Sequence, residues 1–391
     1  MALSGAGTNY DDMRRHNLST VLSSLHRARR ASRSELTVAS GLGRSTVKVL
    51  VEELAGLGLV YESEPQASLR SGRPSPTVAP RPDVLSVAVK RDVRGVAVAF
   101  ATLGGAITHK DFEPMSGGSS LDTARTVAEV IARAPLPAGA RLVGIGAAVP
   151  GFVSGVGEDL VFASSLGWSG QPFARHLTEV TGLPAWTNFD AHLGLVAEST
   201  WGAARGRHNV AYLYGGLGGI GTAAMVNGTL LRGFTGMASA LAHTTVQLGG
   251  RTCTCGSRGC FQAEVISSEW TAARDVVREN SAPGALVDRA LLAQARDRIE
   301  LSIEQTGAAI RNAVIAYDPE VILLDGFLAD VLETGAERLA PYTRAASVPP
   351  LTQQVSLRVP TLGPDLLLVG ASHLGFRGLL EDPAGLMASL P

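Results

Sequence analysis

Long apolar runs and cysteine are both scarce in this sequence of 391 residues. No stretch of about 18 consecutive apolar residues occurs, so no transmembrane helix is predicted. Residues 1–8 lack a basic start followed by an apolar stretch, which predicts no secretion signal and a cytoplasmic protein. The three cysteines all fall between Cys253 and Cys260. An odd, clustered set of this kind indicates a metal site rather than disulfides.

Strong net charge is also absent, but the charge is unevenly distributed. The chain has 34 Lys and Arg residues against 35 Asp and Glu residues. Residues 1–82 contain eleven basic and seven acidic residues, a net +4 that leaves −5 for the rest. Between residues 13 and 48, eight basic residues accompany a single acid, Glu35. A basic segment joined to an acidic body indicates that one end of the chain binds a polyanion.

The first segment has the pattern of a helix-turn-helix. Apolar residues at helical spacing predict a helix over 12–29. Ser32 and Glu35 have the spacing of a capping box, which starts a second, short helix. Gly41 breaks that helix, because glycine tolerates a left-handed turn, and a third helix is predicted over 44–55.

A β-hairpin and then a change of pattern follow these helices. Strands are predicted at 59–61 and 77–79, with a turn at 70–76 between them, so the first segment has the element order of a winged helix. Arg81 and Pro82 form a predicted linker. From there on strands alternate with helices, and at 45% hydrophobic and 18% charged residues the chain can bury a large core. Two or three domains are expected, including an α/β body.

The start of the third helix is the predicted DNA-reading surface, because the second helix of a helix-turn-helix enters the major groove. Arginine there binds guanine bidentately, serine and threonine read several base edges, and lysine takes phosphate. Arginines on the narrow Gly/Pro turn suit the minor groove. The alternative is a helical module whose arginines only face solvent; the wing and the uneven charge favour DNA. The predicted DNA-binding residues are Arg44, Ser45, Thr46, Lys48, Arg70, Gly72 and Arg73.

The cysteines and one histidine form the pattern H-x9-C-x-C-x4-C. Three thiolates and one imidazole fill a tetrahedral zinc shell, and a shell with four protein ligands is structural, since no position remains for water. The alternatives are a set of buried free thiols and a catalytic zinc. The predicted ligands are His243, Cys253, Cys255 and Cys260, for one structural zinc per chain.

With these motifs, nearly the whole chain resembles a ROK-family transcriptional regulator, a winged helix joined to a sugar-kinase-like body. The cysteine loop and the Gly72-Arg73-Pro74 wing are its most specific features. The other matching segments are 34–36, 44–59, 144–151, 166–168, 190–198, 219–221, His243 and 318–322.

The resemblance implies an α/β fold in which a winged helix-turn-helix precedes a two-lobed, actin-like and RNase H-like body with a sugar cleft between its lobes. The implied domains are 1–82 for the DNA-binding domain, 83–187 for lobe 1 and 188–369 for lobe 2 with the zinc loop. Residues 370–391 are expected to return to lobe 1.

The chain departs from the family at the loop that cradles phosphates and metal in ROK kinases, which reads D-x-G-G-T there. The matching stretch is 88–92, where Ala88 replaces the carboxylate and Lys90 and Arg91 replace the glycines. Bulky side chains keep backbone amides away from a phosphate, and no oxygen ligand remains for Mg²⁺. The segment 324–327 replaces a glycine-rich adenine loop. We therefore expect no kinase, and no enzyme of another kind.

The sugar contacts that the family implies are also reduced. Phe189 stands at the position of the family's Asn, with Asn188 one place early, and Ala240 stands at that of a sugar-binding Glu. Each lost charged group removes a hydrogen bond of roughly 1.5–3 kcal/mol. Asp190 keeps the position of the kinase general base, with a helix cap or a solvated side chain as the alternative. The predicted effector contacts are Asp190, His192, which replaces a second Asn, His243, and Gln262, which replaces a Glu.

The function expected from the sequence is a transcriptional regulator, most simply a repressor, of carbohydrate-related genes. Its expected partners are a palindromic double-stranded DNA operator and copies of itself, as a dimer or tetramer. Three hypotheses differ in the cleft: it binds a sugar or sugar derivative, it answers to a non-sugar effector, a protein or nothing, or, remotely, it phosphorylates a sugar.

Overall fold

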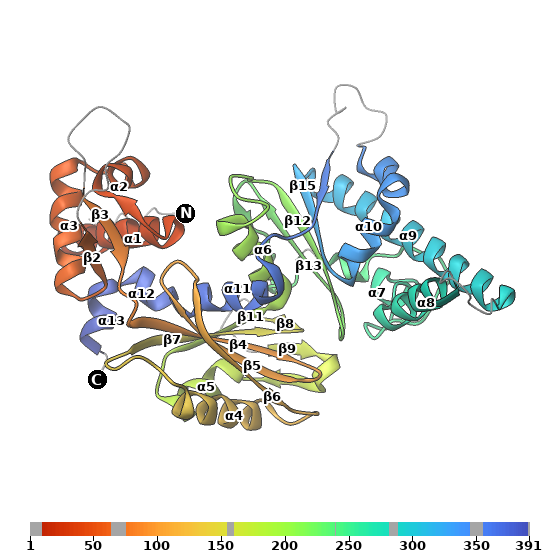
Figure 1. The fold of residues 1–391 in the computed structure, drawn as a ribbon, viewed down its shortest axis with the longest axis horizontal. Helices are drawn as coiled ribbons and strands as arrows, with labels where there is room; N and C mark the ends of the chain where they lie inside the picture. Colours follow the sequence, from red (N-terminus) through yellow and green to blue (C-terminus); the bar gives the residue numbers. More distant parts are fainter. Residues whose placement is uncertain are drawn as a thin grey trace, which may run out of the picture.

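The computed structural model describes residues 10–63, 76–154, 160–238, 240–280, 288–344 and 355–389. Figure 1 shows an N-terminal head of helices α1 to α3 beside a body that contains two separate sheets, each with helices packed on it. The mixed α/β fold with an N-terminal helix-turn-helix is therefore confirmed. Within the described ranges, every helix is too short or too polar to cross a bilayer.

The head consists of three helices and a small antiparallel sheet with the strand order β1-β3-β2. Its buried face is formed mainly by Leu and Val residues of all three helices, which share one hydrophobic core. Its elements are α1 (Tyr10–Ala28), β1 (Ala31–Ser32), α2 (Arg33–Ser40), α3 (Arg44–Gly56), β2 (Val60–Ser63) and β3 (Thr77–Pro80).

Local sequence signals set the turn between α2 and α3. The Ser32 side chain accepts a hydrogen bond from the Glu35 backbone, and the Glu35 carboxylate accepts one from the Ser32 backbone, so both amides at the helix start are satisfied. Gly41 ends α2 with φ of 69°, in the left-handed region that favours glycine. Gly43 then caps α3 in an extended conformation. The predicted capping box and turn are confirmed.

The first sheet of the body has the strand order β11-β7-β4-β5-β6. Its strands are β4 (Val84–Asp92), β5 (Gly95–Thr102), β6 (Ile107–Pro114), β7 (Arg141–Val149) and β11 (Ala185–Phe189). Helices α4 (Ser120–Arg133) and α5 (Phe173–Thr181) pack together on one face. A small sheet of β8 (Phe152–Val153), β9 (Leu160–Ala163) and β10 (Trp168–Gln171) lies beside β11.

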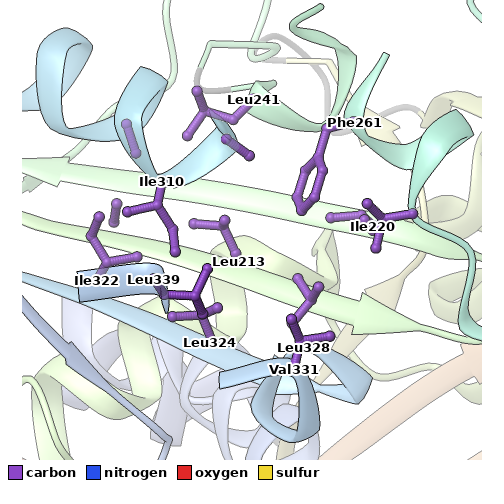
Figure 2. Close-up of a cluster of buried hydrophobic side chains, with 14 of the residues drawn as sticks. Leu213, Ile220, Leu241, Phe261, Ile310, Ile322, Leu324, Leu328, Val331 and Leu339 are labelled. Carbon is purple, nitrogen blue, oxygen red and sulfur yellow. The ribbon is translucent and has the colours of Figure 1, made fainter. Parts of the chain in front are cut away.

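The second sheet has the strand order β14-β13-β12-β15-β16. Its strands are β12 (Val210–Gly216), β13 (Gly219–Val226), β14 (Thr229–Leu230), β15 (Val321–Gly326) and β16 (Ser356–Arg358). The helices on one face are α7 (Phe261–Glu264), α8 (Ser267–Asn280), α9 (Arg289–Tyr317) and α10 (Phe327–Leu339). Figure 2 shows Leu213 and Leu324 of the strands in one cluster with Ile310 of α9 and with Leu328 and Leu339 of α10.

Two helices lie back to back between the sheets: α6 (Asp190–Trp201) and α11 (Leu366–Gly375). Their contact depends on small residues, because a Cβ at Gly370 would overlap the Leu193 carbonyl. In the same way, a Cβ at Gly146 of β7 would overlap the Ala371 carbonyl. These close approaches join the two halves of the body at the first residues of α6, where Asp190 and His192 lie.

The head and body share one hydrophobic core rather than being separated by a free linker. Phe376 and Leu379 at the end of the chain are packed with the buried leucines of α1. Helices α12 (Arg377–Glu381) and α13 (Pro383–Ser389) also contact α1. Only three residues lie between β3 and β4, and the Arg81 amide donates to the Leu59 carbonyl. The position of the head is therefore fixed by packing.

Candidate functional site

The start of α3 exposes the residue types predicted to read DNA. Arg44, Ser45, Thr46 and Lys48 are all exposed, whereas Val47 between them is buried in the head core. Lys48 lies 3.8 Å from Glu52 one turn along the helix, and Arg44 has no ion pair among the described residues. The wing residues Arg70, Gly72 and Arg73 lie outside the described residues. The described part of the predicted surface is thus open to a partner.

The other basic residues of the head are less available than their number in the sequence indicates. The Arg33 guanidinium is paired with the Glu62 carboxylate, which raises the pKa of Arg33. Arg14 pairs with Glu53 at 3.0 Å. Arg29 lies over the ring of Trp201, with 5.6 Å between its guanidinium carbon and the ring centroid. The free positive charge therefore lies in only part of the basic segment.

The four predicted metal ligands converge, with all their ligand atoms within 4.8 Å of one another. His243 Nδ1 lies 3.5 Å from Cys253 Sγ, and Cys255 Sγ lies 3.7 Å from Cys260 Sγ. A tetrahedral zinc with bonds of about 2.3 Å to sulfur and 2.0 Å to nitrogen requires about 3.5 Å between nitrogen and sulfur and 3.8 Å between sulfurs. The donor set and its spacing therefore fit a zinc ion.

The metal loop is held by the second lobe. Phe261 follows the last cysteine directly and is fully buried in the core, close to Leu241 in Figure 2. The backbone amide of Arg251 donates to the Glu264 carboxylate at 2.5 Å. A Cβ at Gly259, whose φ is 72°, would overlap the Gln247 carbonyl, so the loop folds back on itself only with glycine there. This packing brings all four ligands together.

Asp190 and His192 lie in the first turn of α6, and both are buried. Burial raises the pKa of Asp190 to about 7, although its carboxylate accepts a hydrogen bond from the Ala191 amide. Burial also lowers the pKa of His192 to about 4, helped by the charge of Arg232. His192 is therefore neutral near pH 7, and Asp190 is easily protonated there. Neither side chain offers a full, stable charge to a ligand.

The other two predicted effector residues belong to the metal cluster. His243 directs Nδ1 to Cys253, and the Gln262 amide lies 3.5 Å from the same Sγ and 3.3 Å from Thr254 Oγ1. A row of aromatic rings connects them to α6. The ring centroid of Phe152 lies 6.0 Å from that of His243 and 5.6 Å from that of Phe189.

Phe189 continues this row to His192, at 5.5 Å. Its ring also approaches the backbone closely, because a Cβ at Gly221 would lie 3.1 Å from Phe189 Cζ. The four predicted residues thus form two pairs that are joined by aromatic side chains.

The loop that matches the kinase phosphate site contains a buried arginine. The Arg91 guanidinium donates to the carbonyls of Gly95 at 3.1 Å and of Gly117 at 2.6 Å, and also to that of Asp92. Lys90 Nζ lies 3.6 Å from the Asp92 carboxylate. Arg91 therefore has acceptors from the chain itself at the place where the family offers backbone amides to phosphate.

Sequence reasoning missed one further feature, a cavity of about 300 Å³ between the head and the body. It is lined by residues of α1, including Arg27, by residues of α6, α11 and α12, and by Arg232, which follows β14. Its walls come from segments at the two ends of the chain, from Ser23 to Glu381, so no local motif predicts it.

The model of the ROK family matches residues 121–375. This chain belongs to the ROK family. It is similar to a xylose repressor of Bacillus spizizenii, with 24% identity over 90% of this chain and 92% of that protein. It is also similar to a glucokinase of Halalkalibacterium halodurans, with 29% identity over 60% of this chain and 76% of that protein.

Solved structures of the ROK family share the fold. A ROK transcriptional regulator, a homologue of the E. coli MLC protein, superposes with a TM-score of 0.74 and 21% identity, covering 96% of this chain and 98% of that one. A ROK hexokinase from Thermus thermophilus superposes with a TM-score of 0.61 and 26% identity, covering 75% of this chain and 99% of that one. The regulator structure thus covers the head and the body of this chain together, and the hexokinase structure covers a smaller part of this chain.

Proposed function

We propose that this ROK-family chain is a DNA-binding transcriptional repressor of carbohydrate-related genes. The observation that carries the proposal is the open surface at the start of α3, where Arg44, Ser45 and Thr46 are exposed beside the buried Val47. Such a surface suits the major groove. Similarity to a xylose repressor over 90% of the chain supports the same function.

The proposed division of labour follows the sequence. Residues 1–82 bind the operator, with Arg44, Ser45, Thr46 and Lys48 on α3 and Arg70, Gly72 and Arg73 on the wing. Residues 83–187, together with 370–391, and residues 188–369 form the two lobes of the effector and dimerisation module. A homodimer or tetramer presents two heads to a palindromic operator, with half-sites about one helical turn or a multiple of it apart. DNA binding places the protein in the cytoplasm.

We further propose that His243, Cys253, Cys255 and Cys260 bind one structural zinc ion. The 3.5 Å and 3.7 Å separations among their ligand atoms match a tetrahedral shell. Bound zinc would supply no chemistry beyond fixing the loop, because all four positions of its shell are taken by the protein. The bound ion would fix the ring of His243, and through Cys253 it would also fix the Gln262 amide.

The body is proposed not to be a kinase. Arg91 already donates its hydrogen bonds to chain carbonyls, and Ala88 offers no oxygen for Mg²⁺. Asp190, at the position of a general base, is buried. Release of ADP from ATP in the presence of glucose, xylose or an amino sugar would overturn this part of the proposal.

The proposed effector contacts are Asp190, His192, His243 and Gln262. A second candidate, a regulator that answers to a non-sugar ligand or to none, is favoured by the row of rings from Phe152 through Phe189 to His192. Calorimetry with sugars, amino sugars and sugar phosphates separates the two. Saturable binding of a neutral sugar supports the first candidate, and no heat across the panel supports the second.

Repression is tested by deleting the gene and measuring transcripts beside the sites that the purified protein binds. These transcripts should rise, and should fall again when the wild-type gene is returned. A matched strain with the Arg44→Ala variant should behave as the deletion. Transcripts that fall on deletion would show an activator instead.

A further inference from the structure

The cavity between the head and the body is lined by Asn188 and Leu193, next to the first turn of α6, but by none of the four predicted effector residues. Its volume is about 300 Å³, at the lower end of the range of small-molecule sites. Ser23, His26 and Arg27 of α1 line one side, and residues of α6, α11 and α12 line the others. A ligand in it would touch the head and the body at the same time.

The charge of this cavity is strongly positive. Three arginines line it, Arg27, Arg232 and Arg377, against one acid, Glu381. Glu381 is already paired with Arg377, at 3.1 Å from Nε. Arg27 and Arg232 have neither an ion pair nor a side-chain hydrogen bond among the described residues, although they approach the cavity from the head and from the second lobe. Two guanidinium groups without ion pairs, one from the head and one from the second lobe, suit an anion.

Neutral hydrogen-bonding groups complete the walls. The Gly104 amide donates to His26 Nδ1 at 2.8 Å, so the proton of His26 lies on Nε2 and is shared with His373 Nδ1 at 2.9 Å. Burial, and then the charges around it, lowers the pKa of His26, so the ring stays neutral. Asn188 Oδ1 accepts from the Phe189 amide at 2.8 Å and lies 3.2 Å from His192 Nδ1, so its Nδ2 remains as a donor.

We propose that this junction cavity binds a small anionic metabolite that carries a phosphate or carboxylate group, held by Arg27 and Arg232. Because the two arginines belong to different parts of the molecule, the bound anion ties the head to the second lobe. Such a ligand changes DNA affinity if it binds the two head orientations unequally. Only this regulatory consequence rests on the proposed function; anion binding does not.

The test is calorimetry on the full chain with glucose 6-phosphate, 6-phosphogluconate, citrate and inorganic phosphate, with glucose as the neutral probe. We expect saturable binding of at least one anion and weaker or no binding of glucose. Arg27→Gln and Arg232→Gln should each weaken the anion about tenfold or more. Arg278→Gln is the matched control, because it removes the same charge from an exposed arginine of α8 whose ion pair is local.

The phosphate and carboxylate probes decide which anionic group the cavity takes, and either result supports the proposal. No saturable heat with any anion up to about 10 mM overturns it. Equal losses in Arg278→Gln and Arg27→Gln also overturn it, as does glucose binding as tightly as the anions. Thermal melts of each variant check that the fold is intact, and Arg232→Lys, which keeps the charge, should retain part of the affinity.

The regulatory step has its own readout, the affinity for operator DNA with and without the bound anion. We expect a change in wild type that disappears in Arg232→Gln. An anion that binds but leaves DNA affinity unchanged overturns the coupling and leaves the repressor function intact. Failure to bind DNA under any condition contradicts the proposed function instead, and leaves the anion site standing.

Discussion

The start of α3 in the head and the cleft of the body place their charged groups in opposite ways. Arg44 and Lys48 are exposed, and Arg44 has no ion pair among the described residues. In the body, Arg91 is buried under chain carbonyls and Asp190 is buried with a raised pKa. A charge can recognise a ligand only while it is free to exchange water for that ligand. Arg44 and Lys48 keep that freedom, and the buried Arg91 and Asp190 do not.

Loss of a proposed metal ligand should lower stability more than any other substitution considered, and it should destabilise the body and not the head. Cys255→Ser removes one of four ligands, so the metal should be lost and the body should be destabilised by several kcal/mol, because structural zinc binding contributes directly to folding. Metal analysis and thermal unfolding measure both effects.

Ser257→Ala is the matched control for this variant, since the Ser257 backbone carbonyl and not its side chain accepts the Cys253 amide. About one zinc per chain retained in Cys255→Ser would contradict the ligand set.

Asp190→Asn should stabilise the body, whereas loss of the proposed metal ligand Cys255 should destabilise it. The folded carboxyl has a pKa of about 7, and the unfolded one about 3.9, so folding opposes ionisation. Stability is therefore lost as the pH rises from about 4 through 7, and the neutral amide avoids this loss.

The gain in the free energy of unfolding should be about 2 kcal/mol larger at pH 8 than at pH 5. Urea denaturation of both proteins at the two pH values measures it. A variant that is less stable than wild type at pH 8 would show that the charged form makes a favourable contact.

Arg44→Ala should weaken operator binding by about 1–3 kcal/mol and relax the base preference at one position of each half-site. Its stability should stay within about 0.5 kcal/mol of wild type, because the side chain is exposed. Fluorescence anisotropy with operator and mutated-operator duplexes measures the affinity. Arg175→Ala on α5, an exposed arginine of the body, is the control. Equal losses in both variants would remove α3 from the interface.

Lys48→Ala should lower operator affinity less than the Arg44 substitution does, and it should do so without changing the base preference. If Lys48 contacts phosphate, affinity falls on all sequences by a similar factor, and the slope of log affinity against log salt decreases by about 1. The same anisotropy titration at several salt concentrations reports this. A change in base preference without a change of slope would assign Lys48 to a base instead.

Features encoded within a few residues were predictable from the sequence. The capping box of Ser32 and Glu35, the turn at Gly41 and the convergence of the cysteine loop with His243 follow from short spacings. Strand β6 was not predicted, because its eight residues include two acids, a lysine, a histidine and a proline and lack the apolar run of a central strand; none of them is fully buried.

Features formed by distant residues were not predictable. His26 meets His373 across 347 positions, and the head and body share a core that no linker composition signals. The sequence placed the positive charge in the head correctly, but the pairing of Arg33 with Glu62 and the position of Arg27 beside the body are results of packing. Charge counts therefore locate a basic segment, and the structure decides which of its groups are free.

Sequence-specific DNA binding by the head is measured by incubating the purified full-length chain with sheared genomic DNA and sequencing the bound fragments. Enrichment of a few discrete sites that share a palindromic sequence, lost in Arg44→Ala and retained in Arg175→Ala, is the predicted result. Fragments bound without a common sequence, or with the same pattern in both variants, would contradict it.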